Sequence, residues 1–210
     1  MAQTVMNLNN VWVQEISPLN LAFVECDCPK RDAGYPNYFN GGFFAELAGG
    51  KTVPVGNLAN NGVILAQSVD NEDWINLSNK KLTTVVVLKD GSASLQSTNR
   101  LDNIANLKTA ISGIPIIIDG KAVSLANIKK EGYFGSELYD TWHSFLGLRE
   151  KKLVYVAAQC DFDQMVWIMV ALGIYNAIKL DGGGSFILYN DRIIEVTSGN
   201  RRINNVGLWG

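Results

Sequence analysis

The chain carries one acidic residue, three glycines and a serine in direct succession: Asp181, Gly182, Gly183, Gly184 and Ser185. Short strand-like segments lie on either side of this run. Consecutive glycines let a backbone adopt positive φ or touch a ligand directly, where a side chain would interfere. A carboxylate, bare N–H groups and a hydroxyl around one point can bind a phosphate or a developing oxyanion. The alternative is a hairpin with a glycine-rich turn, and this segment alone favours that simpler interpretation.

Three further segments hold residues that could act on a ligand: Asn40-Gly41-Gly42, Ser112-Gly113 and the only histidine, His143. The first precedes two phenylalanines, which indicates either a turn ahead of core aromatics or a second backbone-rich wall of a pocket. The second introduces a flexible backbone into an apolar strand. A lone histidine among aromatic residues is more often a hydrogen-bonded structural residue than a catalyst, so both interpretations of His143 stay open.

Length and composition favour one domain over residues 1–210. Of the 210 residues 47% are hydrophobic and 18% charged, which is enough apolar material for a core. The net charge of −2 argues against a nucleic-acid partner, which would need basic residues to neutralise phosphates. The longest apolar run, 165–174, is too short to span a bilayer, so no membrane partner is expected. The N-terminus shows no secretory signal, which predicts a cytoplasmic protein or one carried by a phage particle.

The three cysteines, Cys26, Cys28 and Cys160, form neither an even set nor a CxxC pair. We therefore expect reduced thiols and no disulfide framework. Cys26-Asp27-Cys28 could be half of a metal site, but the sequence offers no second pair of soft ligands. No cofactor is predicted. A divalent cation held by hard oxygen ligands such as Asp181 and Asn40 is compatible with the sequence but not required by it.

Apolar and alternating segments predict strands at 11–13, 21–24, 63–66, 83–88, 114–118, 121–123, 152–158, 177–180, 185–189, 192–196 and 203–209. The last four should form a meander. Helices are expected at 101–110 and at about 163–175, the second capped by Asp161 or Asp163 and buried on more than one side. Residues 29–42 are expected to form a long ordered loop. The predicted fold class is α+β: one compact domain of mixed, mainly antiparallel sheets with a few packed helices.

Five segments, in order, resemble the landmarks of the phosphodiester glycosidase family. They are Asn40-Gly41-Gly42-Phe43-Phe44, Ser112-Gly113-Ile114-Pro115 with Asp119-Gly120, His143 to Gly147, Leu180 to Ser185, and Arg201-Arg202-Ile203-Asn204-Asn205. The resemblance extends over residues 35 to 209. Each motif alone is a moderate signal, whereas five in the same order are specific.

Two departures from the family pattern bear on function. His143 stands where the family usually has arginine, and histidine carries a positive charge only part of the time at neutral pH. Gln159-Cys160-Asp161 stands where the family has an Asp-Gly turn. The first change touches the expected site and could alter the leaving group or abolish hydrolysis. The second could reshape only the rim.

The resemblance implies a hydrolase of glycosyl phosphodiester bonds with Asp181 and His143 as catalytic residues. Asp181 would activate water or face the anomeric carbon, and His143 would bind phosphate or protonate the leaving oxygen. The substrate-binding residues would be Asn40, Gly41, Gly42, Ser112, Gly113, Gly182, Gly183, Gly184, Ser185 and Arg201. Arg201 would supply the cation for the phosphate. Asn40, Gly113, His143, Asp181 and Arg201 should then converge on one cleft at strand ends.

The expected partner is a small molecule or glycan with a sugar-phosphate linkage: a sugar-1-phosphodiester, a teichoic-acid-like polymer, or a nucleotide sugar or ADP-ribose-like compound. The alternative is a non-hydrolytic binding protein, possibly phage-encoded, that sequesters a phosphorylated sugar or nucleotide signal. The substitution at His143 keeps this alternative open. A purely structural role is weaker, because three glycine-rich loops would then have no reason. The sequence does not predict an oligomeric state.

Overall fold

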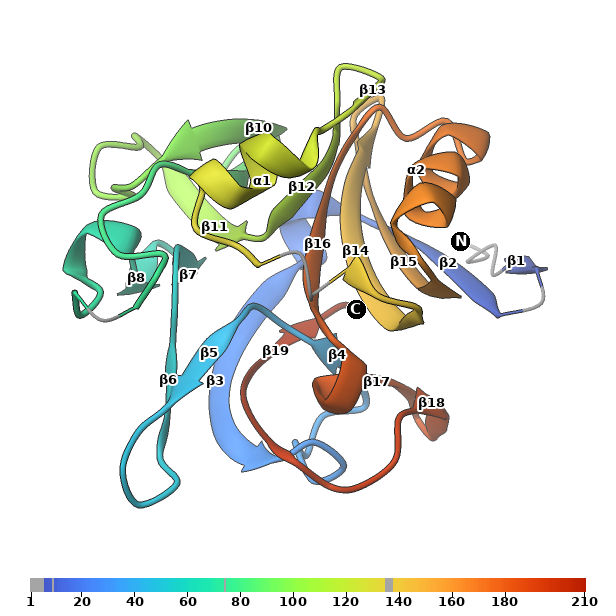
Figure 1. Cartoon of the computed structure of the whole chain (residues 1–210), viewed down its shortest axis with the longest axis horizontal. Helices are drawn as coiled ribbons and strands as arrows, with labels where there is room; N and C mark the ends of the chain where they lie inside the picture. Colours follow the sequence, from blue (N-terminus) through green and yellow to red (C-terminus); the bar gives the residue numbers. More distant parts are fainter. Residues whose placement is uncertain (1–5, 9, 74, 135–137) are drawn as a thin grey trace.

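Antiparallel β-sheets dominate the computed structural model, which describes residues 6–8, 10–73, 75–134 and 138–210 (Figure 1). The largest sheet has seven strands in the order β1 (Met6–Leu8), β2 (Val11–Ile16), β15 (Lys152–Cys160), β14 (Thr141–Arg149), β16 (Asn176–Gly182), β12 (Ile114–Ile118) and β13 (Lys121–Ala122). Every pairing within it is antiparallel.

Two five-stranded sheets and a hairpin complete the fold. The β9 sheet runs β10 (Ala93–Thr98), β9 (Leu82–Leu88), β11 (Leu107–Ser112), β7 (Leu58–Asn60) and β8 (Val63–Ala66). The β4 sheet runs β18 (Ile193–Val196), β17 (Ile187–Asn190), β4 (Asn37–Asn40), β19 (Arg202–Leu208) and β3 (Ala22–Pro29). The hairpin joins β5 (Phe44–Glu46) to β6 (Thr52–Pro54). In Figure 1 the three sheets surround a centre that β16 crosses.

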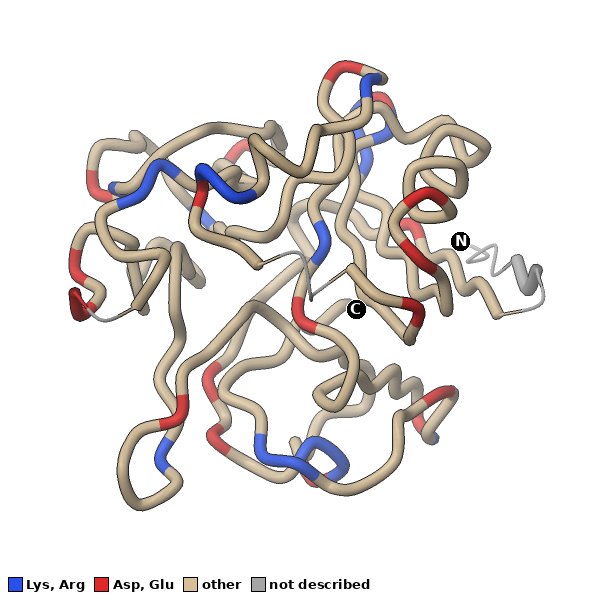
Figure 2. The backbone as a smooth tube through the Cα atoms, viewed as in Figure 1, with Lys and Arg blue, Asp and Glu red and all other residues tan. Residues whose placement is uncertain are grey.

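The predicted α+β class was wrong, because the protein is mostly β. Strands account for 49% of residues and helical turns for 13%. The described residues contain two α-helices, α1 (Leu125–Lys130) and α2 (Phe162–Ala171), and the 3₁₀ turns η1 (Pro18–Asn20), η2 (Ser68–Asp70) and η4 (Gly183–Ser185). No described helix is long and apolar enough to cross a membrane. Figure 2 shows basic and acidic residues interspersed along the chain.

The helix predicted at 101–110 is absent. Residues 101–106 form turns, with Asn106 in the left-handed region at φ 54°, and β11 begins at Leu107. Asparagine tolerates this conformation, which ends a helix rather than continuing one. β11 then pairs with β9 on one side and β7 on the other. Tertiary pairing therefore overrides the local helical pattern.

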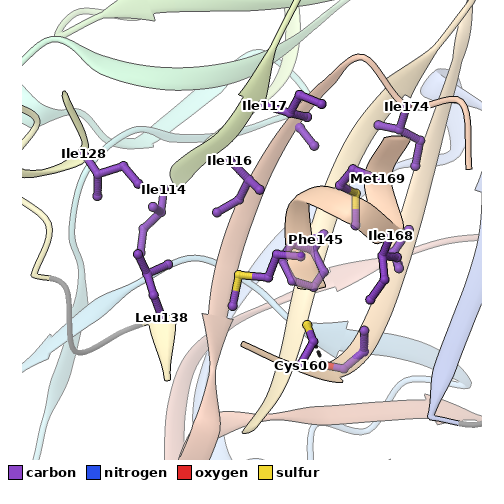
Figure 3. Close-up of a cluster of buried hydrophobic side chains, with 14 of the residues drawn as sticks. Ile114, Ile116, Ile117, Ile128, Leu138, Phe145, Cys160, Ile168, Met169 and Ile174 are labelled. Carbon is purple, nitrogen blue, oxygen red and sulfur yellow. Dashed lines mark hydrogen bonds between the residues drawn. The ribbon is translucent and has the colours of Figure 1, made fainter. Parts of the chain in front are cut away.

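The other predicted helix exists but is shorter than expected. Asp161 accepts a hydrogen bond from the Gln164 N–H, and the Gln164 side chain accepts from the Asp161 N–H, which is a capping box. Its Met165 and Met169 are buried, whereas Trp167 is 71% exposed. The expectation that α2 is buried on more than one side was therefore wrong. Figure 3 shows Ile168 and Met169 near Phe145 and Ile174, in the core that α2 covers.

Two predictions about chain organisation also fail. Residues 37–40 were expected in a loop but form β4, which lies between β17 and β19 in the β4 sheet. The predicted C-terminal meander is interrupted, since β16 belongs to the seven-stranded sheet and β17 to the β4 sheet. The segment Asp181–Ser185 is therefore not a hairpin turn. It carries the chain from one sheet to another.

The predicted strands otherwise match the structure, including the turn at Asp119-Gly120 between β12 and β13. A second buried cluster lies where the sheets face one another. There Phe39 stacks on Tyr155 with ring centroids 4.1 Å apart, and on Trp209 at 5.7 Å. These aromatic contacts hold the β4 sheet against the seven-stranded sheet. The segment that contains Asp181 connects these two sheets, so both of its ends are held in place.

Candidate functional site

Asp181 and the Asn40-Gly41 segment are held together by two hydrogen bonds. The Asn40 side-chain N–H donates to the Asp181 carbonyl, and the Asp181 N–H donates to the Gly41 carbonyl at 3.1 Å. The Asn40 amide oxygen accepts from the Ser144 hydroxyl at 2.8 Å, and that hydroxyl contacts the Tyr155 hydroxyl at 3.0 Å. Asn40 is 1% exposed. Its amide therefore fixes the backbone of Asp181 and is committed to that task in this structure.

The two glycines after Asn40 leave room for Asn205. Its side-chain oxygen accepts the Gly42 N–H at 2.7 Å, and its carbonyl accepts the Gly41 N–H at 3.0 Å. A Cβ at Gly41 would lie 2.1 Å from the Asn205 side-chain oxygen, so only glycine fits there. The Asn40-Gly41-Gly42 segment is thus hydrogen-bonded to β19, next to the backbone of Asp181.

In the loop that follows Asp181, backbone carbonyls accept hydrogen bonds from neighbouring segments. Gly183 has a φ of 54°, which glycine adopts readily. Its carbonyl accepts hydrogen bonds from the Phe186 N–H and the Thr197 hydroxyl. The Gly182 N–H donates to the Asp181 carboxylate at 2.8 Å. Ser185 is buried, and its hydroxyl lies near the Asp181 carboxyl, whose pKa it lowers.

The Asp181 carboxyl lies in an unusual electrostatic environment. Although the residue is partly exposed, burial of its carboxyl raises the pKa above the ordinary value of 3.8. Four neighbours partly oppose that rise, in decreasing order: the charge of Lys179, the Gly182 N–H, the Ser185 hydroxyl and the charge of Arg201. A carboxyl with a raised pKa is suited to proton transfer near neutral pH.

His143 is buried and neutral. Its Nε2 contacts the Tyr139 carbonyl at 2.9 Å, and its Nδ1 has no hydrogen-bond partner among the described residues. Burial, and secondarily the charge of Lys179, lowers the pKa of His143 to about 3. The ring lies edge-on to Tyr139 and Phe145. The packed, uncharged alternative is thus the one that this geometry supports.

Arg201 lies beside the glycine loop at the protein surface. It is exposed, and its guanidinium lies 5.1 Å from the centroid of the Phe44 ring. The position that a Cβ on Gly184 would take is 4.0 Å from an Arg201 guanidinium nitrogen, so no wall separates the two. Arg201 is therefore placed to offer a cation to a ligand above the glycines.

Ser112 and Gly113 lie where β11 passes into β12. The Ser112 hydroxyl accepts the Asn57 N–H at 2.9 Å and is buried. A Cβ at Gly113 would lie 2.4 Å from the Lys179 carbonyl. The Ser112 hydroxyl is therefore used within the β9 sheet, and the lack of a side chain at Gly113 allows the close approach to β16.

The structure brings Asn40, Gly182, His143 and Asp181 into direct contact and places Arg201 beside the loop. A Cβ at Gly182 would lie 3.1 Å from the His143 Nδ1. A cavity of about 680 Å³ lies elsewhere, lined by residues that include Glu25, Gln67 and Asp70. No group of three or more His, Cys, Asp or Glu residues within the described ranges could hold a metal ion.

Three residues of this site were missed by the sequence interpretation. Lys179 is 2% exposed, and its ammonium lies 5.1 Å from the Phe43 ring centroid. Lys30 is fully buried and bonds to the loop. The Tyr139 hydroxyl would lie 2.8 Å from a Cβ on Gly183. Lys179 was detectable, because it is two positions before Asp181 on an apolar strand and so shares its face.

Similarity to known proteins identifies the family of this chain. A sequence profile of the family described as phosphodiester glycosidase matches residues 37–208. The chain belongs to the phosphodiester glycosidase family. A comparison with curated protein sequences finds no match. The predicted family resemblance is thereby confirmed.

Solved structures share the fold. The catalytic domain of zebrafish N-acetylglucosamine-1-phosphodiester alpha-N-acetylglucosaminidase, auto-inhibited by its pro-peptide, has a TM-score of 0.74 at 15% identity. The similarity covers 99% of this chain and 82% of that one. A hypothetical protein from Synechocystis has a TM-score of 0.62 at 13% identity, covering 98% of this chain and 61% of that one. At such identities the likeness establishes the fold alone.

Proposed function

We propose that this protein hydrolyses glycosyl phosphodiester bonds. Asp181 transfers the proton, and Arg201 with the glycine loop holds the phosphate. One observation carries the proposal: a carboxyl of raised pKa lies within the influence of two cations, Lys179 and Arg201, at the start of the glycine loop. Family membership supports the reaction class.

The chemistry of the glycosyl phosphodiester bond determines the tasks of the site. The leaving group of a glycosyl phosphodiester is a phosphate, which departs more readily than an alkoxide and needs less protonation. The remaining tasks are to stabilise an oxocarbenium-like transition state, hold the phosphate and activate water. The Asp181 carboxylate accepts the proton of water or faces the anomeric carbon. A neutral His143 supplies no permanent charge, so phosphate binding depends on Arg201 and the backbone donors.

The substrate is a sugar-1-phosphodiester, a teichoic-acid-like polymer, or a nucleotide-sugar or ADP-ribose-like compound. The name of the zebrafish relative supports the first of these, since it specifies a 1-phosphodiester of N-acetylglucosamine. No resident metal is part of the proposal.

The test is incubation with a panel of glycosyl phosphodiesters and nucleotide sugars, with products read by mass spectrometry. Asp181→Asn keeps size and hydrogen bonding but removes basicity, so turnover should fall by about 10²–10⁴-fold. The matched control is Asp119→Asn. Asp119 is exposed in the β12–β13 turn at φ 49°, which asparagine tolerates equally. Near-normal turnover in Asp181→Asn would remove Asp181 from the mechanism.

A second candidate function is binding without turnover. Its support is the neutral, buried His143 at the position where the family usually has arginine. Such a protein would return each ligand of the panel unchanged while retaining one of them through purification. Release of free sugar or phosphate by the wild type, lost in Asp181→Asn, would exclude it.

A further inference from the structure

Lys30 is a fully buried lysine whose ammonium contacts only neutral oxygen atoms in the described structure. It follows β3 directly and is 0% exposed. Its Nζ donates to the carbonyls of Gly184 and Thr197, each at 2.9 Å, and to the Thr197 hydroxyl at 3.0 Å. The Ser198 carbonyl lies at 3.5 Å. Within the described ranges no carboxylate lies within ion-pair distance of it.

Burying this charge is unfavourable, which calls for an explanation. Charged groups inside proteins are normally paired with an opposite charge or bound to a metal. Burial, followed by the charges of Arg31 and Arg201, lowers the pKa of Lys30 below its ordinary value of 10.5. The compensating oxygens come from the glycine loop itself, in η4, and from the residues after β18. The ammonium therefore joins these two segments.

This arrangement fixes the direction of the loop's peptide groups. The Gly184 carbonyl points to Lys30, and the Gly183 carbonyl accepts the Thr197 hydroxyl at 2.6 Å. All described peptide bonds are trans, so each N–H points away from the carbonyl of its own peptide group. The N–H groups of Gly184 and Ser185 consequently point away from Lys30. The Ser185 N–H is part of the 3₁₀ turn η4, so the Gly184 N–H is the donor that this loop presents.

We infer that Lys30 is a positioning residue: its buried ammonium holds the Gly183-Gly184 backbone so that the Gly184 N–H faces the phosphate of the substrate. This inference rests on the proposed function for its ligand, whereas the geometry of the loop is independent of it. Lys30 acts through the loop and touches no reacting atom.

The test uses three variants of the full chain. Lys30→Met removes the ammonium and keeps the length of the side chain. Thr197→Val removes the hydroxyl that links Lys30 to Gly183 and keeps the shape. Lys121→Met, at an exposed lysine of β13, is the matched control. Melting temperatures are recorded first, and all rates are measured where each variant is folded.

Two readouts follow, kcat with KM on the best substrate of the panel, and the affinity for inorganic phosphate. The phosphate affinity is read from the amide NMR signals of Gly184 and Ser185. Charge on the phosphate grows as the sugar bond breaks, so misplaced donors should lower kcat more than they raise KM. We expect a kcat loss of about 10²-fold in Lys30→Met. We expect a smaller loss of kcat in Thr197→Val, and losses that do not add in the double variant Lys30→Met/Thr197→Val. Phosphate binding should be weaker in each variant.

The outcomes separate the two proposals. If Lys30→Met melts earlier but keeps the wild-type kcat and phosphate affinity, Lys30 is only structural and the inference is overturned. If the wild type hydrolyses nothing in the panel, yet phosphate shifts the two amides and Lys30→Met abolishes the shift, hydrolysis fails and the positioning role stands. A wild type with neither turnover nor phosphate binding would overturn both.

Discussion

The protonation state of His143 makes a quantitative prediction for stability. The folded protein lowers its pKa from 6.5 to about 3. At about 1.36 kcal/mol per pH unit, the charged ring is about 5 kcal/mol less favourable in the fold than in water. His143 is 1% exposed, so solvent does not screen this cost. Between these two pKa values the unfolded chain binds a proton that the folded protein does not.

The free energy of unfolding should therefore fall as the pH falls below 6.5, and this contribution should level off near pH 3. At pH 5 the loss from this one residue should be about 2 kcal/mol relative to pH 7. Urea unfolding at each pH measures the effect. Because other groups titrate in the same range, the comparison is with His143→Gln, which does not titrate and whose side-chain N–H can still donate to the Tyr139 carbonyl.

The difference in unfolding free energy between wild type and His143→Gln should thus shift by about 2 kcal/mol between pH 7 and pH 5, against the wild type. A difference that stays constant would show that the ring is not kept neutral. A shift in favour of the wild type at low pH would mean a charged His143 in the fold. That result would restore the interpretation in which imidazolium holds the phosphate, and ligand affinity would then weaken as pH rises.

Three other variants test the site and its framework. Gly41→Ala should destabilise the protein by about 1–3 kcal/mol, because the new Cβ would displace the Asn205 side-chain oxygen and leave the buried Gly42 N–H unpaired. Chemical denaturation measures this loss of stability. Arg201→Gln should raise KM by about 10–100-fold with the melting temperature unchanged, since an exposed cation on the phosphate is lost; unaltered KM would exclude that role. His143→Arg should lower the melting temperature and not improve phosphate affinity, because it buries a permanent charge near Lys179. Adding Lys179→Met should recover part of the stability. A His143→Arg variant as stable as the wild type would contradict the reasoning.

Local signals account for the parts of the fold that the sequence predicted. Asp119-Gly120 in a tight turn, Asp161 before an apolar helix and the apolar runs of β9 and β15 each specify their structure within a few residues. The failures are non-local. Residues 37–40 form a central strand because β17 and β19, about 150 and 165 positions later, pair with them. The overall class was therefore misjudged although most strands were placed.

The same distinction applies to the candidate site. Motif order brought Asn40, Asp181 and Arg201 to attention, and the structure places them at one junction of two sheets. It also gives the amide of Asn40 a different task from the expected one, since that side chain holds backbone rather than facing a ligand. Lys30 had no local signal, because its oxygen partners lie 154 to 168 positions away.

Charge is distributed around Asp181 in a way that explains why a histidine is tolerated at position 143. Lys179 and Lys30 already place two ammonium groups inside the protein near the loop. A third buried cation at 143 would face the Lys179 charge without the solvation that Arg201 has on the surface. A neutral ring avoids this repulsion and still anchors the Tyr139 backbone. The cation that meets the phosphate in this proposal is then the exposed Arg201, which can exchange water for ligand at little cost.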